Sequence, residues 1–358
     1  MNHVYKLKLN ILKVSGIAFS FFLFADPAGG SDADSLFRSE EVIEMELRSD
    51  FSSIQKDRDE NPEYHNGELI YLSNTGEQVI LNVKVMARGN FRLKPSNCKF
   101  PPLLVNFKKS ETKNTLFENQ DKLKLVTPCQ AEEDLIDEYS VYKMYNQVTD
   151  LSFKVRLARI LYFDTGLNKA VFEKYSFFVE DKDHVAERNN LVAEDRIATP
   201  FDIETDNYIK LSLFQYMIGN KDWWVSSRKN LVIMHSRDSS SGLYAVPYDF
   251  DFSGIVDADY TKPLGVPDYS IADRRRYKGI CFTDEEFSKV FEFYRELRPS
   301  LESVINNQDF ISRFDKKAKL RYLKEFYTVI NNKYLFKQNI LNFCETRQDY
   351  KLAENIIR

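Results

Sequence analysis

The sequence predicts an α+β protein of two lobes, with a β-rich lobe over residues 40–180 and a mostly helical lobe over residues 181–358. Three observations predict this division. Apolar and polar residues alternate with a period of two at several places before residue 180, which is typical of strands. One segment among these strands has helical spacing instead. Beyond residue 200, apolar residues recur at helical spacing over long stretches.

The strands of the first lobe are predicted from short apolar runs. Asn-Thr-Gly at 74–76 separates an apolar run at 69–71 from an alternating run at 81–87, so a hairpin is expected. Further strands are expected at residues 103–107, 123–126, 155–163 and 173–180. Residues 132–149 predict the single helix of this lobe, because apolar side chains recur there at helical spacing after three acidic residues.

The second lobe is predicted to begin with a well-delimited helix. Thr205 or Asp206 can cap its start, and Gly219 is expected to end it. Two short strands follow, at residues 230–235 and 243–248. Two long helices are then expected, at residues 283–305 and 311–343.

The first thirty residues have the order of a secretory signal. Residues 1–13 carry three lysines and no acid, residues 14–25 form a nearly unbroken apolar run, and small residues follow at 28–30. We therefore predict a signal peptide over residues 1–30 and export to the periplasm, the cell surface or the extracellular space. The alternatives are an uncleaved anchor and a helix buried in the fold. No later stretch is apolar enough for a transmembrane span.

Charge and cysteine content narrow the classes of protein. The formal net charge is -4 and the pI is about 5.8, which argues against a general nucleic-acid binder. The partner expected from the function classes below is a protein substrate or an envelope or surface protein. An exported chain can form disulfides. Cys98 with Cys129 is the favoured pair and Cys281 with Cys344 can form a second, while four buried free thiols are an equally weighted alternative.

The residues suited to chemistry concentrate around the predicted hairpin of the second lobe. Asp222 lies in the loop after the helix, Asn230 opens the next strand, and Asp249 and Asp251 follow the strand after that. Phosphoryl transfer needs one carboxylate to orient the attacking hydroxyl, and an Asn and a second carboxylate to hold magnesium on the phosphates. The order of these residues therefore predicts a site for ATP and Mg²⁺ or Mn²⁺.

At these residues the chain resembles the CotH kinase family, whose members have an atypical, two-lobed protein-kinase-like fold. The resembling motifs are Gly219-Asn220-Lys221-Asp222, then Asn230, then Pro247-Tyr248-Asp249-Phe250-Asp251, with Arg88-Gly89-Asn90 upstream. The resemblance implies that Asp222 is catalytic, that Asn230 and Asp249 bind the metal, and that Asp251 supports or shares it. It implies a phosphate-binding cation, either Lys122 or Arg88, and a helix glutamate paired with it, Glu133 or Glu138.

The chain also departs from the usual kinase pattern. It has no Gly-rich loop, the interval from Asp222 to Asn230 is eight residues, and the bulky Trp223 and Trp224 follow the Asp. Both Trp residues are interpreted as packing residues. The basic run at 274–278 is interpreted as a solvated face, with an acidic partner as the alternative.

Three function classes follow from these observations. The first is an exported CotH-like kinase that phosphorylates Ser or Thr of proteins or another hydroxyl compound. The second is a catalytically silent kinase-like protein that binds a partner at the surface or in the envelope. The third is a metal-dependent hydrolase that uses Asp222, Asp249 and Asp251 as a carboxylate cluster.

Overall fold

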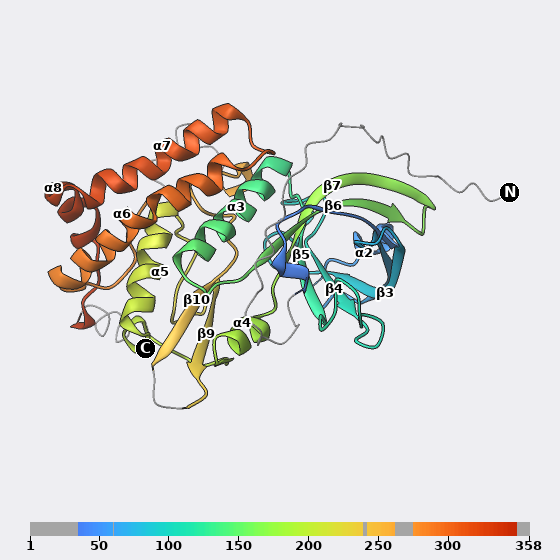
Figure 1. Cartoon of the computed structure of the whole chain (residues 1–358), viewed down its shortest axis with the longest axis horizontal. Helices are drawn as coiled ribbons and strands as arrows, with labels where there is room; N and C mark the ends of the chain where they lie inside the picture. Colours follow the sequence, from blue (N-terminus) through green and yellow to red (C-terminus); the bar gives the residue numbers. More distant parts are fainter. Residues whose placement is uncertain (1–34, 60, 239–241, 262–274, 349–358) are drawn as a thin grey trace, which may run out of the picture. The chain divides into compact units, whose positions relative to one another are not determined.

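A computed structural model describes residues 35–59, 61–238, 242–261 and 275–348, which belong to one compact unit (Figure 1). The predicted α+β class is confirmed: a β-rich first part is followed by a helical C-terminal region. The predicted signal peptide lies outside the described residues. Among the residues that the structure describes, no helix has both the length and the apolar character needed to cross a bilayer.

Seven strands of the first part form a closed barrel in the order β1-β2-β3-β4-β5-β7-β6. Their bounds are β1 Ile43–Ser49, β2 His65–Leu72, β3 Gln78–Ala87, β4 Leu103–Phe107, β5 Lys122–Val126, β6 Val155–Asp164 and β7 Lys169–Val179. Neighbouring strands are antiparallel except β1 and β6, which pair in parallel and close the barrel. The predicted strands, including the hairpin of β2 and β3, are confirmed. Their apolar side chains, at alternate positions, point into one shared interior.

Two helices provide the framework of the site. Helix α3 (Glu132–Val148) contacts β6 and β7 as well as α5 and α6, and its buried side chains join the core of the helical part. Helix α5 (Thr205–Ile218) is capped by the Glu204 carboxylate, which accepts from the Asn207 amide at 2.8 Å, so the predicted caps Thr205 and Asp206 are wrong by one or two residues. It ends at Gly219 as predicted, in a left-handed conformation with φ 69°.

The second part carries a small antiparallel sheet and the C-terminal helices. The sheet has the order β10-β9-β8, with β8 Leu191–Ala193, β9 Leu231–Ser236 and β10 Leu243–Pro247. The helices are α6 Asp284–Asn306, α7 Arg313–Ile330, α8 Lys333–Phe336 and a π-helical turn, η4, at Lys337–Leu341. The predicted helix over 311–343 is therefore wrong in its length, because Asn332 ends the run and caps α8.

Several short elements have no counterpart in the sequence analysis. They are α1 Ser35–Arg38, α2 Phe51–Ile54, α4 Lys182–Arg188, η1 Pro200–Asp202 and η2 Asp259–Thr261. Each is seven residues or fewer, too short to show the periodicity that predicts a helix. The boundary between the two lobes at residue 180 stays a prediction.

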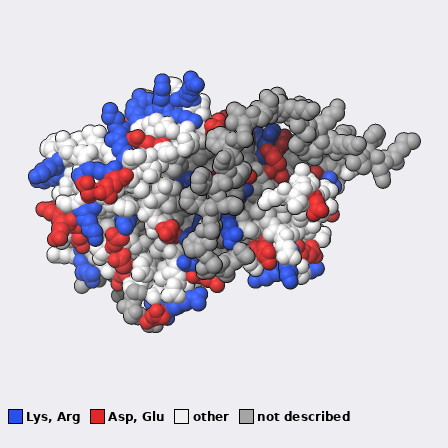
Figure 2. All heavy atoms as spheres, viewed as in Figure 1, with Lys and Arg blue, Asp and Glu red and all other residues white. Residues whose placement is uncertain are grey.

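The favoured pairing of Cys98 with Cys129 and the second pairing of Cys281 with Cys344 are both confirmed, and the alternative of four free thiols is wrong. The first disulfide is buried in the barrel part, whereas both cysteines of the second are half-buried. The surface charge is uneven. Figure 2 shows Lys and Arg gathered over α7, where Arg313, Lys317, Arg321 and Lys324 are exposed and form no ion pair with another described residue.

Candidate active site

The loop that carries Asp222 leaves the C-terminus of α5. Gly219 turns the chain there, and the buried Asn220 follows it. The Asn220 side-chain oxygen accepts a hydrogen bond from the Asp222 amide at 2.8 Å, which fixes the turn between them. The Asp222 carboxylate remains partly exposed.

The seven residues between Asp222 and Asn230 form a miniature hairpin. Trp224 and Lys229 pair through both backbone hydrogen bonds, and the Arg228 amide closes the turn onto the Val225 carbonyl at 2.9 Å. The chain thereby returns Asn230 to Asp222: its amide nitrogen donates to the Asp222 carbonyl at 2.8 Å and to the carboxylate at 3.1 Å. The two residues are therefore in contact, although the interval between them in the sequence is longer than is usual for kinases.

The two tryptophans of this loop have different environments. Trp223 is buried against Tyr208 of α5, with ring centroids 6.2 Å apart, so its interpretation as a packing residue is confirmed. Trp224 is half-buried, and the Lys278 ammonium lies 4.9 Å from its ring centroid. On the polar side of the loop, Lys229 forms an ion pair with the Asp222 carboxylate.

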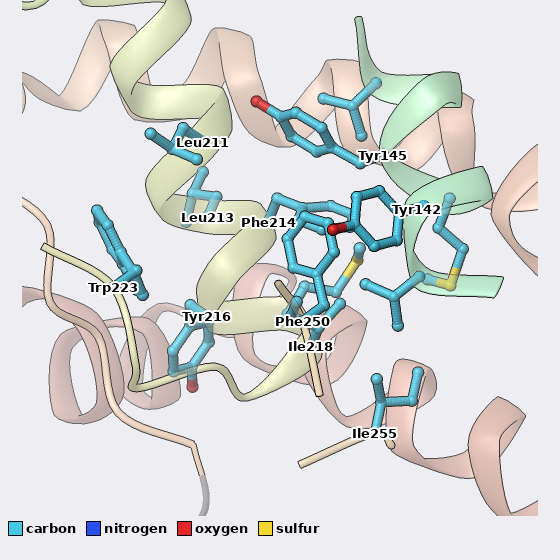
Figure 3. Close-up of a cluster of buried hydrophobic side chains, with 14 of the residues drawn as sticks. Tyr142, Tyr145, Leu211, Leu213, Phe214, Tyr216, Ile218, Trp223, Phe250 and Ile255 are labelled. Carbon is cyan, nitrogen blue, oxygen red and sulfur yellow. The ribbon is translucent and has the colours of Figure 1, made fainter. Parts of the chain in front are cut away.

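Asp249 follows β10 in a left-handed conformation with φ 62°. Its amide donates to the hydroxyl of Tyr142 on α3 at 2.7 Å. The next residue, Phe250, is fully buried between α3 and α5, with its ring centroid 4.8 Å from Tyr142 and 5.9 Å from Phe214 (Figure 3). The buried aromatic ring therefore anchors a strained residue whose half-buried carboxylate accepts no hydrogen bond from another described residue.

A buried ionic cluster lies beside Asp249. The Arg92 guanidinium is 3.3 Å from the carboxylate of Glu138 on α3 and 3.9 Å from that of Asp251, and it also donates to the Thr127 carbonyl. Tyr260 donates to Asp251 at 3.0 Å. The cluster therefore holds two carboxylates with a single guanidinium between them.

Burial and charge perturb every acid and base in this cluster. Burial, together with the negative charges of Asp249 and Asp222, raises the pKa of Asp251 to about 7 against the opposing effect of Arg92. Burial and the charge of Asp251 raise the pKa of Glu138 well above its ordinary value. Burial disfavours the charged form of Arg92, but the surrounding Tyr260, Glu138 and Asp251 outweigh it and raise its pKa. The charges of Asp249 and Asp222 thus both act on Asp251.

Of the two lysines on β5, Lys124 rather than Lys122 is the one that interacts with residues of the predicted site. Lys122 is exposed at the start of β5, whereas Lys124, two residues along the same face, is half-buried with its ammonium 4.6 Å from the ring centroid of Tyr248. Burial and the positive charge of Arg88 lower the pKa of Lys124 to about 8, while Asp249 raises it. The structure thus brings Lys124 and Arg88 toward Asp249. Lys124 differs from Lys122 in that its side chain is half-buried, whereas that of Lys122 is exposed.

The helix glutamate and the basic run are also placed. Glu138 is buried on α3 and pairs with Arg92, a residue that the sequence analysis missed. In the sequence, the one signal for Arg92 is its position four residues after Arg88. In the basic run, Arg275 and Lys278 donate to backbone carbonyls, so the interpretation of these two as a solvated face is wrong. Arg274 lies outside the described residues.

A cavity of about 280 Å³ opens next to these residues. Lys124, Lys182 and Arg228 supply cationic walls, Asp195 an acidic one, and Leu231 and Ile233 of β9 an apolar one. Tyr248 lines the cavity directly before Asp249, and Leu231 directly after Asn230. The cavity is therefore lined by the sequence neighbours of both predicted metal ligands.

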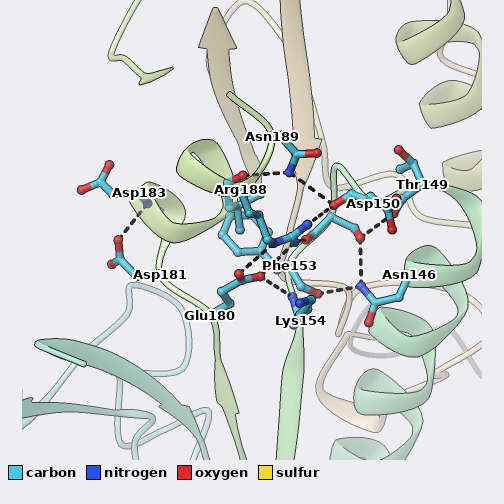
Figure 4. A network of polar contacts seen from close by, with 12 residues as sticks. Asn146, Thr149, Asp150, Phe153, Lys154, Glu180, Asp181, Asp183, Arg188 and Asn189 are labelled. Carbon is cyan, nitrogen blue, oxygen red and sulfur yellow. Dashed lines mark hydrogen bonds and ion pairs between the residues drawn. The ribbon is translucent and has the colours of Figure 1, made fainter. Parts of the chain in front are cut away.

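The chain between β7 and β8, which borders the cavity, is held by a buried ion pair (Figure 4). Glu180 accepts from Arg188 at 2.9 and 3.0 Å and from the Lys154 amide at 2.9 Å. Arg188 also donates to the carbonyls of Asp150 and Ser152. This network fixes α4, which carries Lys182, against the start of β6.

The donor set fits a hard divalent cation. The Asn230 amide nitrogen is used by Asp222, which leaves its side-chain oxygen, and the Asp249 carboxylate accepts no hydrogen bond from another described residue. Oxygen ligands of this kind suit Mg²⁺ or Mn²⁺. Within the part of the chain that the structure describes, no three His, Cys, Asp or Glu side chains converge as a metal-binding group.

No protein-family model matches the sequence, and a search of curated proteins finds no match. Among solved structures, the chain is similar to the Helicobacter pylori proinflammatory kinase CtkA, with 12% sequence identity and a TM-score of 0.38, over 64% of this chain and 89% of that one. A similarity at this TM-score carries neither fold nor activity over to this chain, so the resemblance to the CotH family stays a prediction.

Proposed function

We propose that this protein is a kinase-like phosphotransferase of the CotH type, which transfers a phosphoryl group from ATP to a Ser or Thr hydroxyl of a protein or to another hydroxyl acceptor. One observation carries the proposal. Asn230 donates to Asp222, and its carbonyl accepts from the amide of Tyr248, the residue directly before the left-handed Asp249 and part of a cavity with cationic walls. Phosphoryl transfer depends mainly on positioning and on charge stabilisation of this kind.

Each residue has a separate role in the proposed reaction. Asp222 orients the acceptor hydroxyl and takes its proton. Asn230 and Asp249 hold Mg²⁺ or Mn²⁺, which when bound neutralises charge on the phosphates. Lys124 binds a phosphate, and with a pKa of about 8 it is largely protonated at neutral pH. Arg88 adds positive charge beside Lys124, and Asp251, fixed by Tyr260 and Arg92, supports the metal end of the site.

The cavity suits a nucleotide. Leu231 and Ile233 offer an apolar surface for a base, and Asp195 offers an acceptor for ribose hydroxyls. Lys182 and Arg228 add positive charge for phosphates. The nucleotide would therefore extend from β9 toward Asp249.

The proposal includes export and a protein acceptor outside the cytoplasm. The charge and apolar pattern of residues 1–30 supports export. The two disulfides also support it, since such bonds persist in oxidising compartments. The expected acceptors are proteins of the envelope or the cell surface.

The test combines ligand binding with phosphoryl transfer. ATP with Mg²⁺ or Mn²⁺ should raise the melting temperature of the full chain, because a ligand that binds only the folded state stabilises it. Asp249→Ala should abolish the metal-dependent rise, and Asp309→Ala, at an exposed aspartate between α6 and α7, should retain it. Asp222→Ala should keep binding and lose transfer of labelled γ-phosphate by about 100-fold or more. The absence of any rise with every nucleotide and metal would exclude the kinase.

One observation favours a second candidate, the silent binding protein. The exposed basic face of α7, with Phe314 exposed beside it, suits an acidic envelope partner. Binding of that kind should survive Asp249→Ala and fail when Lys317 and Arg321 are replaced by Glu. The hydrolase has no comparable support, since Asp222, Asp249 and Asp251 do not form a three-carboxylate metal group among the described residues.

A further inference from the structure

Residues 275–281, here called the strap, cross the C-terminus of α5 at the point where the Asp222 loop begins. Arg275 donates to the carbonyls of Tyr216 and Met217, in the last turn of α5, at 3.1 and 3.0 Å, and to the Tyr322 carbonyl of α7 at 2.9 Å. The last carbonyls of a helix lack a full set of partners within it, and an arginine there can satisfy them. Arg275 therefore helps to cap α5 and ties its end to α7, which fixes the helix from which the loop departs.

Lys278 holds the loop itself. Its ammonium donates to the Lys221 carbonyl at 2.7 Å and to the Trp223 carbonyl at 3.1 Å, on the two sides of Asp222. The same ammonium lies 4.9 Å from the ring centroid of Trp224. One cation thus restrains the carbonyls of the residues before and after Asp222, and so the direction of its carboxylate.

The strap has little freedom to move. Tyr277 is buried, and its hydroxyl donates to the Ile280 carbonyl at 3.1 Å and lies 3.3 Å from the Ser212 hydroxyl of α5. A Cβ on Gly279 would lie 2.5 Å from Cζ of Tyr277 and 2.8 Å from Cβ of Ser212. Close packing on α5 therefore keeps Lys278 in register with the loop.

A disulfide ties the far end of the strap. Cys281 is bonded to Cys344, and two backbone hydrogen bonds, from Cys281 to the Glu345 carbonyl and from Glu345 to the Gly279 carbonyl, accompany it at 3.1 Å each. Both cysteines are half-buried, unlike the buried Cys98 and Cys129. This bond is thus the more accessible of the two to a reductant.

We propose that Lys278 is a positioning residue for Asp222, and that the Cys281–Cys344 disulfide regulates the site by holding the strap that carries Lys278. The proposal rests on the proposed function for its catalytic consequence. A dithiol breaks the bond between the two sulfur atoms, supplies two electrons and two protons to form two thiols, and is itself oxidised to a disulfide. Reduction then loosens the loop, lowers the rate of phosphoryl transfer and leaves the nucleotide cavity in place.

Intrinsic fluorescence tests the positioning without any need for activity. The chain has two Trp residues, and both lie in this loop. Lys278→Met should change the emission spectrum and its quenching by acrylamide, and Lys278→Arg should restore them in part. Lys289→Met, at an exposed position of α6, is the matched control. Unchanged emission in Lys278→Met would overturn the proposal whatever the protein catalyses.

Kinetics then separate positioning from a general loss of structure. Lys278→Met should lower kcat by about 10- to 100-fold with the KM for the nucleotide nearly unchanged, because a misplaced catalytic group affects the chemical step. A higher KM with the same kcat would overturn the proposal. A wild-type chain without transfer activity would reject the proposed function alone, since the fluorescence result would still stand.

The disulfide is tested with two matched double variants. Cys281→Ser with Cys344→Ser should give the emission and kcat of Lys278→Met, and adding Lys278→Met to it should lower kcat little further, because both changes act through one contact. Cys98→Ser with Cys129→Ser should leave the emission unchanged. Equal effects of the two double variants on emission, or fully additive effects with Lys278→Met, would overturn the regulatory part.

Discussion

Two segments of this molecule are tied by a disulfide next to the candidate site, and they contribute to it differently. Residues 88–98 send a side chain inward: Arg92 lies among buried carboxylates, and its segment ends at the buried Cys98. Residues 275–281 send Lys278 to backbone carbonyls on the two sides of Asp222, and end at the half-buried Cys281. The first segment thus neutralises buried carboxylates, and the second fixes the position of the Asp222 loop. Damage to the first should reduce stability, and damage to the second should reduce rate.

The largest expected effect is that of Arg92→Ala. It leaves Glu138 and Asp251 buried without their cation, so we expect a loss of about 3–5 kcal/mol in the free energy of unfolding, measured by urea denaturation. Lys278→Met should cost only about 1–2 kcal/mol, because it removes hydrogen bonds without leaving a buried charge.

A second substitution sharpens this comparison. Adding Glu138→Gln to Arg92→Ala removes one of the stranded carboxylates and should recover part of the stability. Equal losses of unfolding free energy in Arg92→Ala and Lys278→Met would show that the two segments do not differ in their contribution to stability.

A smaller effect is expected from pH, through the same cluster. Because the folded state raises the pKa of Asp251 to about 7, it keeps a proton that the unfolded chain releases near pH 4. The stabilisation is therefore complete below about pH 4 and is lost as the pH rises through about 7, at no more than about 1.4 kcal/mol per pH unit. Urea midpoints from about pH 5 to about pH 8 measure the slope. Asp251→Asn should weaken this dependence of stability on pH. An unchanged slope would show that other groups cause the dependence.

The smallest effects concern one glycine in each segment. Gly89 has φ 109°, and a Cβ at this position would come no closer than 4.0 Å to its nearest neighbour, so Gly89→Ala should cost about 1–2 kcal/mol through backbone strain alone. Gly279→Ala meets the buried Tyr277 and should cost about 1–3 kcal/mol through overpacking. A double variant Gly279→Ala with Tyr277→Leu, which removes Cζ as well as the hydroxyl, tests this reason. Tyr277→Leu should cost less in the Gly279→Ala background than alone, whereas Gly89 has no close neighbour of this kind among the described residues.

The sequence predicts much of the fold because the relevant signals are local. The alternation in β3, the spacing in α3 and the Gly219 stop lie within single elements, and each is confirmed. The break after α7 had a local signal too, the pair Asn331-Asn332, but the helical spacing continues past it. The α5 cap was missed because Glu is a less usual cap than Thr or Asp.

The site is less predictable, since its residues come from distant parts of the chain. Asp222 and Asn230 follow one another on a loop and are in contact, and Asp249 follows the hairpin whose strands pair Leu231 with Pro247, so their order alone predicts this arrangement. Arg92 meets Glu138 and Asp251 only after the barrel and the helices have packed, and no spacing in the sequence predicts that contact. Lys122 and Lys124 share a strand face, and only the depth of each in the fold tells them apart.

The parallel pairing of β1 with β6 sets an order for the folding of the chain. Ile43 pairs with Ala158, so the barrel cannot close until a strand far along the chain has been made. Contacts of such long sequence separation slow folding and leave strand edges open meanwhile. Cys98 and Cys129 both precede β6, so their bond can form while the sheet is still open. An oxidising folding environment would thus tie the open sheet before its last strand arrives, which shortens the search for closure.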